Sequence, residues 1–329
     1  MRARHDRAIA LGQTLLAKAE QLGDPLSLSV GHRVLGSTLF TLGDFARARE
    51  HLEQAVELRQ RTASEESPLS YAVDPRIAGQ LMLAWDLWVL GYPARAHHNA
   101  FQALGQAVEG ADPYSIAFAH YVTSAVQLLR GQFQDSLAYA DRSLTVAKEH
   151  GVNLYALYSR FGRGCALVKM RQPEQAIIEI REGIEEARRS NLGYMRGFML
   201  GWLATAQAEI GDMETALATI DEALQLVGDI SGRAWEAELR RLRGDILLAA
   251  RRDAAVDAER SYKEAIAVAK TQQAHSLELR AATSLARLLL GQGRRAEARA
   301  QVAEAFGWFT EGFDTADLIE AKELLTQLN

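Results

Sequence analysis

Apolar residues recur at helical spacing along this chain, in many short stretches that alternate with tight turns. Within each stretch the apolar positions lie three or four residues apart, as an amphipathic helix requires. Three turns end in an Asp-Pro pair, at residues 24–25, 74–75 and 112–113. Aspartate can cap the free amide groups of a helix start, and proline suits the first helical position. The pattern predicts many short helices and no strand.

Small residues repeat at a period near 40, and this repeat is the strongest pattern in the sequence. Two antiparallel helices approach closely only where small side chains lie at their crossing points. Three series occupy such points: Gly36, Ala84, Ser124, Gly164, Ala204, Gly244 and Ala286; Ala48, Ala96, Ser136, Ala176, Ala216, Ala258 and Ala298; Ala55, Ala103, Ser143, Gly183, Ala223, Ala265 and Ala305. Glycine occupies most turns between the first two series, where a tight turn needs its backbone freedom, and Arg171 and Asp253 depart from this rule.

The step of 12 residues from the first series to the second, and of seven to the third, resembles the tetratricopeptide repeat (TPR). The period is near 40 instead of about 34, and the usual proline after the second helix is absent, so longer helices are expected. We predict an all-α fold, a right-handed α-solenoid of TPR-like helix hairpins. We expect one continuous solenoid, with an orphan second helix of a preceding repeat at 1–24, seven helix pairs at 25–307 and a capping helix at 308–329.

The predicted orphan helix has no first helix to pack against, so the N-terminus looks cut. Leu11, Leu15 and Leu16 would then lack part of their cover. This exposed helix is therefore a candidate dimer contact.

Composition narrows the class of partner and the compartment. The chain has 37 basic and 42 acidic residues, and its net charge of -5 does not favour nucleic acid. Cys165 is the one cysteine, which excludes an intrachain disulfide framework and any multi-cysteine metal site. No apolar run is long enough for a membrane helix, and the N-terminus lacks the apolar core of a signal peptide. These features predict a cytoplasmic protein that does not bind membranes.

Four stretches carry a family resemblance: LAWDLWVLGYPARA at 83–96, WEAELRRLRGDILL at 235–248, QQAHSLELRAATSLARLLLGQGRRAEAR at 272–299, and GWFTEGFDTADLIEAKELL at 307–325. They resemble the C-terminal TPR-like region of large bacterial signalling proteins, in which a class III adenylate/guanylate cyclase domain and an AAA-type ATPase domain precede the solenoid. The resemblance implies a sensor or interaction module for signal transduction, with the missing upstream domains as candidate partners. The cyclase and ATPase residues have no counterpart in this sequence, so neither activity is carried over.

The sequence contains no motif for catalysis, a metal or a cofactor. There is no GxxxxGK[ST] phosphate loop, and no HxxxH or HExxH pair. His97 and His98 are adjacent, so their side chains diverge on a helix. We therefore predict a protein that is not an enzyme and binds neither metal nor cofactor.

Aromatic residues gather on the first helices of the predicted hairpins, which line the concave surface in TPR arrays. The candidate groove residues are Leu81, Trp85, Trp88, Phe118, Tyr121, Tyr158, Phe161, Arg163, Phe198, Arg241 and Arg287. The same register places Cys165, Glu238 and Arg280 on this surface. An aromatic groove that leads to a charged end could hold an apolar peptide, a partner helix or a small ligand.

Each of these positions also has a structural interpretation. The aromatic side chains could fill a tight superhelix or pack between neighbouring repeats. Arg163 could offer a planar donor fork to a carboxylate or phosphate, or it could pair with a neighbouring glutamate. The sequence favours a module that binds a protein segment in its concave groove. The alternative is a small-molecule sensor, whose ligand fills the superhelix and regulates attached domains.

Overall fold

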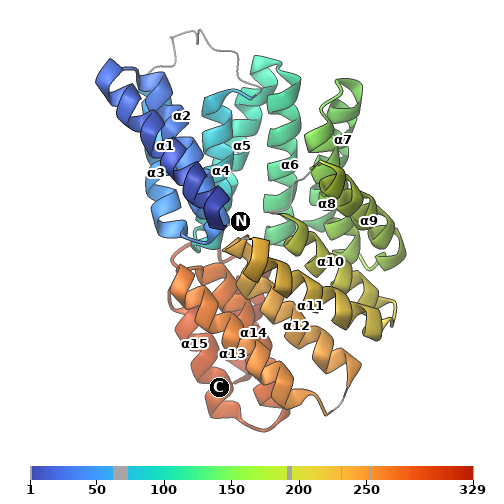
Figure 1. Ribbon diagram of the computed structural model, residues 1–329. Coiled ribbons are helices and arrows are strands. Elements are labelled where there is room, and N and C mark those ends of the chain that lie inside the picture. The colour runs from blue at the N-terminus through green and yellow to red at the C-terminus, as the bar shows by residue number, and fades with distance from the viewer. Residues whose placement is uncertain (1, 62–72, 191–194, 231, 252, 329) are drawn as a thin grey trace.

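The computed structural model describes residues 2–61, 73–190, 195–230, 232–251 and 253–328 (Figure 1). These residues form sixteen α-helices and a short 3-10 helix, and they contain no strand. The helices are α1 (Arg2–Leu22), α2 (Pro25–Leu42), α3 (Phe45–Arg61), α4 (Pro75–Val89), α5 (Pro93–Gly110), α6 (Pro113–Arg130), α7 (Phe133–Glu149), α8 (Asn153–Lys169), α9 (Pro173–Arg189), α10 (Arg196–Glu209), α11 (Met213–Ile230), η2 (Arg233–Trp235), α12 (Glu236–Ala250), α13 (Ala255–Gln272), α14 (His275–Gly291), α15 (Arg295–Phe306) and α16 (Ala316–Gln327).

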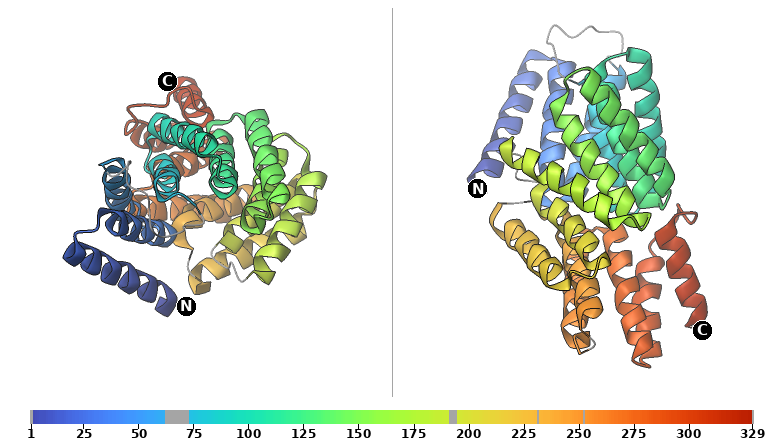
Figure 2. Two further views of the ribbon diagram at one scale, coloured as in Figure 1. Left: turned by 90° about the horizontal axis from the view of Figure 1, so that it is seen from above. Right: turned by 90° about the vertical axis from the view of Figure 1, so that its right-hand side faces the viewer.

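From α2 onward, consecutive helices pair as hairpins, and each hairpin packs against the next. The first helices of successive hairpins (α4, α6, α8, α10, α12 and α14) also contact one another. This stacking builds a right-handed α-solenoid. Viewed from above, the hairpins wind around a central axis (Figure 2), and the helices from α12 to α15 lie below those from α2 to α6 in Figure 1.

The three series of small residues lie at the helix crossings, and every member is buried. A Cβ atom added at Gly36 would lie 2.6 Å from Leu52 Cγ, and one added at Gly164 would lie 2.4 Å from Ile180 Cγ1. Two of the serines at these positions donate to backbone carbonyls: Ser124 Oγ to Ser136 and Ser143 Oγ to Ala117, each over 2.7 Å. The predicted packing role of the small residues is confirmed.

The predicted turn chemistry is also present. The carboxylates of Asp24, Asp74 and Asp112 each accept a hydrogen bond from a backbone amide in the first turn of the following helix. Gly91 ends its helix at a φ of 88°, in the left-handed region. Arg171, which departs from the glycine pattern, still adopts a φ of 59° there, so the turn is kept at some conformational cost.

Helix α1 packs on α2 through close contacts, with Leu16 against Gly31 and Leu35 against Gly12. Its opposite side keeps apolar surface in water, because Leu11 is 60% exposed. A dimer through this helix stays a prediction.

The two ends of the solenoid meet. The segment between α15 and α16 lies on the turn of the second hairpin, where Trp308 contacts Gly91 and Gly312 contacts Pro93. It also reaches the third hairpin, where Asp314 pairs with Arg130 at 2.5 Å. Glu311 accepts hydrogen bonds from both the backbone amide and the side-chain Nε of Arg95, each over 3.0 Å. The solenoid therefore closes on itself instead of ending as an open spiral.

This closure has its own apolar core. One buried cluster combines Phe40 and Trp88 from the early hairpins with Trp235, Ala274 and Leu277 from the late ones. The burial of these residues stabilises the closed arrangement, since a large apolar side chain that leaves water contributes about 1.5–3 kcal/mol. The first helices are thereby held around one interior space.

Candidate functional site

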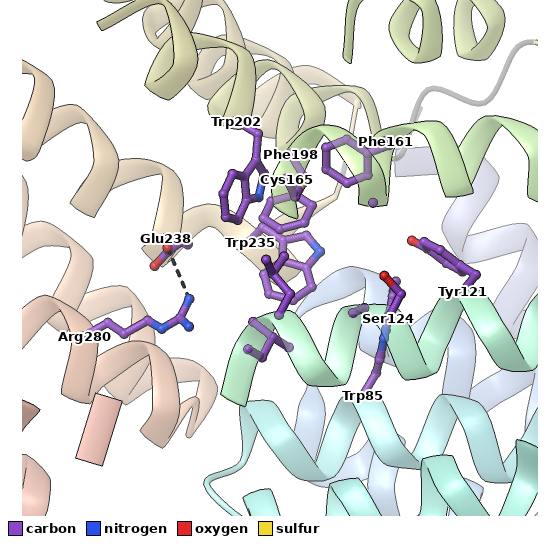
Figure 3. A pocket seen from close by; sticks show the side chains of 14 residues that line it. Trp85, Tyr121, Ser124, Phe161, Cys165, Phe198, Trp202, Trp235, Glu238 and Arg280 are labelled. Carbon is purple, nitrogen blue, oxygen red and sulfur yellow. Dashed lines mark hydrogen bonds and ion pairs between the residues drawn. The ribbon is translucent and has the colours of Figure 1, made fainter. Parts of the chain in front are cut away.

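A pocket of about 40 Å³ lies inside the superhelix, where the first helices of six successive hairpins converge (Figure 3). Its lining residues are Trp85, Tyr121, Ser124, Ala125, Leu128, Leu129, Phe161, Gly162, Cys165, Phe198, Trp202, Trp235, Glu238 and Arg280. A cavity needs about 10–15 Å³ to admit one water molecule, so this pocket has room for about three water-sized groups. It matches the branched end of one aliphatic side chain.

Aromatic rings form a continuous wall around this space. The Phe198 ring stacks on Trp235 with 4.2 Å between their centroids, and it meets the edge of Phe161 at 5.6 Å. Trp85 contacts Tyr121 at 5.7 Å and Trp235 at 6.3 Å, both edge to face. These are the separations at which aromatic pairs attract each other. The wall therefore joins early and late hairpins.

Charged side chains close the other end of the pocket. Glu238 accepts hydrogen bonds from Arg241 Nη2 over 2.8 Å and Arg280 Nη1 over 3.4 Å. Burial alone would raise the pKa of Glu238, but the two guanidiniums outweigh it and lower the pKa to about 2. Arg280 also pairs with Asp317 at 2.7 Å. The carboxylate is thus ionised and fully held by arginine.

Cys165 lies in the wall and is 2% exposed. Burial raises its thiol pKa well above the ordinary value. The thiol is therefore uncharged at neutral pH and acts as a small apolar group instead of a nucleophile.

The structure brings four of the eleven candidate residues into the pocket wall, Trp85, Tyr121, Phe161 and Phe198. Two others lie behind this wall. Tyr158 stacks on Tyr121 at 5.2 Å, and Arg241 supports Glu238 from within the protein.

The remaining five candidates lie away from the pocket. Leu81 is fully buried among helices, Trp88 is covered by the Arg280 guanidinium at 4.8 Å, and Phe118 stacks on Tyr155 at 5.0 Å. Two arginines point to surface carboxylates: Arg163 pairs with Glu179 and Asp141, and Arg287 pairs with Glu320.

Two pocket tryptophans were not among the candidates. Trp202 lies on α10 one turn after Phe198, off the register used for the concave face. Trp235 lies in η2, before α12 begins, where no helical register applies. The i, i+4 spacing of Phe198 and Trp202 was the signal available in the sequence for the first of them.

In the part of the protein that the structure describes, no three histidine, cysteine or acidic side chains come together as a metal site would require. None of the helices described has both the length and the apolar character needed to cross a bilayer.

Comparison with known proteins agrees with the architecture. A family model for the tetratricopeptide repeat matches residues 33–69. A search of curated protein sequences gives no significant match. A Rap protein complexed with competence and sporulation factor superposes with a TM-score of 0.64 at 14% identity, over 99% of this chain and 93% of that chain. The protein has a TPR-like α-solenoid fold.

Two further structures of this fold are similar. The Rap conjugation gene regulator of plasmid pLS20, in complex with the Phr* peptide, has a TM-score of 0.60 at 13% identity and covers 92% of this chain and 78% of that chain. NprR in complex with its cognate peptide NprX has a TM-score of 0.58 at 16% identity and covers 87% and 84%. The predicted all-α solenoid of TPR-like hairpins is confirmed.

Proposed function

We propose that the protein is a non-catalytic interaction module that binds a protein segment inside its superhelix. The observation that carries this proposal is the aromatic pocket, to which Trp85, Phe198 and Trp235 contribute from three separate hairpins. A bound segment inserts one apolar side chain into the pocket and runs along the concave surface to either side. Similar solenoids supply support, since the Rap protein and NprR structures each contain a bound factor or peptide.

The pocket is suited to anchor such a segment. Aromatic side chains dominate the energetics of interfaces when they form a well-packed, desolvated centre. The rings already contact one another, so little side-chain freedom is lost when a ligand group enters, and this favours affinity.

We also propose which class of protein supplies the bound segment. The stretches at 83–96, 235–248, 272–299 and 307–325 resemble the TPR-like region of bacterial cyclase–ATPase signalling proteins, and all four meet at the closure of the solenoid. We infer that the segment bound by this module belongs to such upstream signalling domains. A binding assay between this protein and the cyclase–ATPase part of a protein of that class tests this inference, independently of whether the pocket is the binding site.

The pocket itself is tested with a variant that fills it. Peptides are first selected from a random display library on the wild-type protein, and their affinities are then measured by fluorescence anisotropy. Ala125 lines the pocket, so Ala125→Leu places three more carbons in it without removing any wall residue. The control Ala218→Leu adds the same atoms at an exposed position of α11.

We expect Ala125→Leu to weaken the selected peptides at least about tenfold, equivalent to about 1.4 kcal/mol, while Ala218→Leu binds as the wild type does. Circular dichroism confirms that both variants are folded. Equal binding by Ala125→Leu and the wild type would place the peptide site elsewhere and overturn the proposal.

A further inference from the structure

Lys169 lies beside the pocket residue Trp202 and has no carboxylate partner among the described residues. It is the last residue of α8 and follows Phe161 and Cys165 at spacings of eight and four, so it continues the line of the two pocket residues. Its ammonium lies 5.7 Å from the ring centroid of Trp202. Among the described residues, no carboxylate lies within ion-pair distance of Lys169 Nζ.

The acidic groups around Lys169 are already paired with arginines. Glu238 is held by Arg241 and Arg280, and Asp317 is held by Arg280 at 2.7 Å. Glu209, which also faces Lys169, is bonded to Arg171 at 3.0 Å. Lys169 is therefore the cation of this cluster that has no carboxylate within ion-pair distance, although Glu238 and Asp317 act on its charge from farther away.

Trp202 offers a second unsatisfied group beside this cation. Its side chain is 6% exposed and lines the pocket, yet its indole Nε1 has no hydrogen-bond acceptor in the described structure. The indole Nε1 of Trp85, on the facing side of the pocket in Figure 3, is likewise buried without an acceptor. A buried donor left unpaired costs about 1–3 kcal/mol, so an acceptor supplied by a ligand would be favoured there.

A cation and an unpaired N–H donor at one place select an anionic acceptor. We propose that the pocket takes an apolar side chain together with a carboxylate of the same ligand, and that the carboxylate binds between the Lys169 ammonium and the Trp202 indole N–H. This inference rests on the proposed function, because it names the chemistry of the segment that the pocket binds. Lys169 is the specificity-determining residue, and a neutral segment of the same shape binds less well.

The electrostatic surroundings support this assignment. Burial and the nearby Arg241 and Arg280 guanidiniums lower the pKa of Lys169. The carboxylates of Glu238 and Asp317 offset part of this effect. The Lys169 residue as a whole is exposed, so a ligand can reach it from solvent.

The test uses a pair of probes that differ only in charge. N-acetyl-leucine carries a branched apolar group and a carboxylate, and N-acetyl-leucinamide is its neutral counterpart. Both are titrated at pH 7.5 while the fluorescence of the pocket tryptophans is followed. We expect the acid to bind the wild type about fivefold more tightly than the amide, the upper end of what an ion pair open to solvent contributes.

Substitutions show which residues cause the preference for the acid over the amide. In Lys169→Met the acid and the amide should bind with the same affinity, whereas Lys169→Arg should keep the preference for the acid. Trp202→Phe keeps a ring but removes the N–H donor and should reduce the preference. Lys148→Met removes an exposed lysine of α7 and serves as the matched control, which should bind both probes as the wild type does.

A third probe, N-acetyl-leucyl-aspartamide with a free β-carboxylate, distinguishes the source of the anion. Preference for this probe over its asparagine counterpart assigns the site to an acidic side group, and preference for N-acetyl-leucine alone assigns it to the C-terminal carboxylate of a peptide. Equal binding of acid and amide by the wild type, or a preference that survives in Lys169→Met, would overturn this inference while the pocket proposal stands. Binding of none of the probes would overturn both.

Discussion

The hydroxyl of Ser276 donates a hydrogen bond to the backbone carbonyl of Trp88 over 2.6 Å, although the two residues are 188 positions apart. In an open solenoid each repeat contacts only its neighbours. This bond instead joins the second hairpin to the seventh. It lies beside the stacked pair of His275 and Trp308, whose ring centroids are 3.8 Å apart. Closure of the superhelix is therefore built from specific polar and aromatic contacts as well as from apolar burial.

The Ser276 bond can be removed with little change of shape. Ser276 is 4% exposed, and the Trp88 carbonyl keeps a second hydrogen bond from the Gly91 amide at 3.0 Å. Ser276→Ala should therefore lower the free energy of unfolding by about 1 kcal/mol, the usual net value of one hydrogen bond. Urea unfolding measures this change. Thr271→Ala, at an exposed position on α13, is the control, and an equal loss in both variants would show that the closing bond contributes nothing.

The glycine at a helix crossing is tested by adding one carbon. A Cβ atom at Gly164 would lie 2.4 Å from Ile180 Cγ1 and 3.3 Å from the Ala176 carbonyl oxygen, so the helices of the fourth hairpin must move apart. Gly164→Ala should cost about 1–3 kcal/mol of stability. Gly105→Ala, where nothing lies within 4 Å of the added atom, should instead stabilise helix α5 by about 0.5–1 kcal/mol. The same sign in both variants would contradict the packing argument.

A buried alanine of the second series of small residues tests the same close packing in another hairpin. Ala216 is fully buried at the start of α11, whereas Ala218 on the same helix is exposed. Ala216→Leu overpacks the crossing and should cost about 1–3 kcal/mol, and Ala218→Leu should change stability by only a few tenths. Thermal unfolding of the two variants compares them directly. A loss for Ala216→Leu as small as that of Ala218→Leu would show that the assigned register is wrong.

The protonation of His120 should make the folded protein less stable in acid. Burial, together with the Arg142 guanidinium, lowers the pKa of His120 to about 4 in the folded protein, against 6.5 for the exposed imidazole. Above pH 6.5 this residue is neutral in both states and has no effect. Between pH 6.5 and 4 the unfolded state binds a proton that the folded state does not, so stability falls with pH over this window and levels off below it.

The variant His120→Gln isolates this contribution. The pH dependence of its unfolding free energy, subtracted from that of the wild type, should show the loss between pH 6.5 and 4, because the other titrating groups cancel. Superimposable profiles would show that His120 is protonated in the folded protein as readily as in the unfolded one.

The sequence was sufficient to predict the helices and their close crossings, because these depend on local chemistry. Asp74 caps α4 as its Asp-Pro pair predicts, and Ala96 and Ala176 are fully buried where the repeat places them. The inward side was predictable in the same way for α4 and α10. Trp85 and Phe198, both chosen by register, line the pocket.

The sequence could not show which inward residues remain accessible, because that depends on the pitch of the superhelix. Trp88 lies one turn from Trp85 and faces inward, but the returning α14 covers it with Arg280. The contact of Ser276 with Trp88 depends on the sum of small rotations over the intervening repeats, which no local pattern records. Trp235 joins the pocket for the same reason, since the late hairpins bring it against Phe198 and Trp85.

The thiol of Cys165 reports most directly on the central claim, that the solenoid closes around an interior binding pocket. Cys165 is the only cysteine, lines the pocket and is 2% exposed. The measurement is its rate of reaction with fluorescein maleimide in the native protein, with Trp308→Ala as a variant that loses part of the closure. We expect the native protein to react at least about 100-fold more slowly than the urea-unfolded protein. The reaction should be faster in Trp308→Ala and slower when a selected peptide is bound. A native rate equal to that of the unfolded protein, unaffected by peptide, would contradict it.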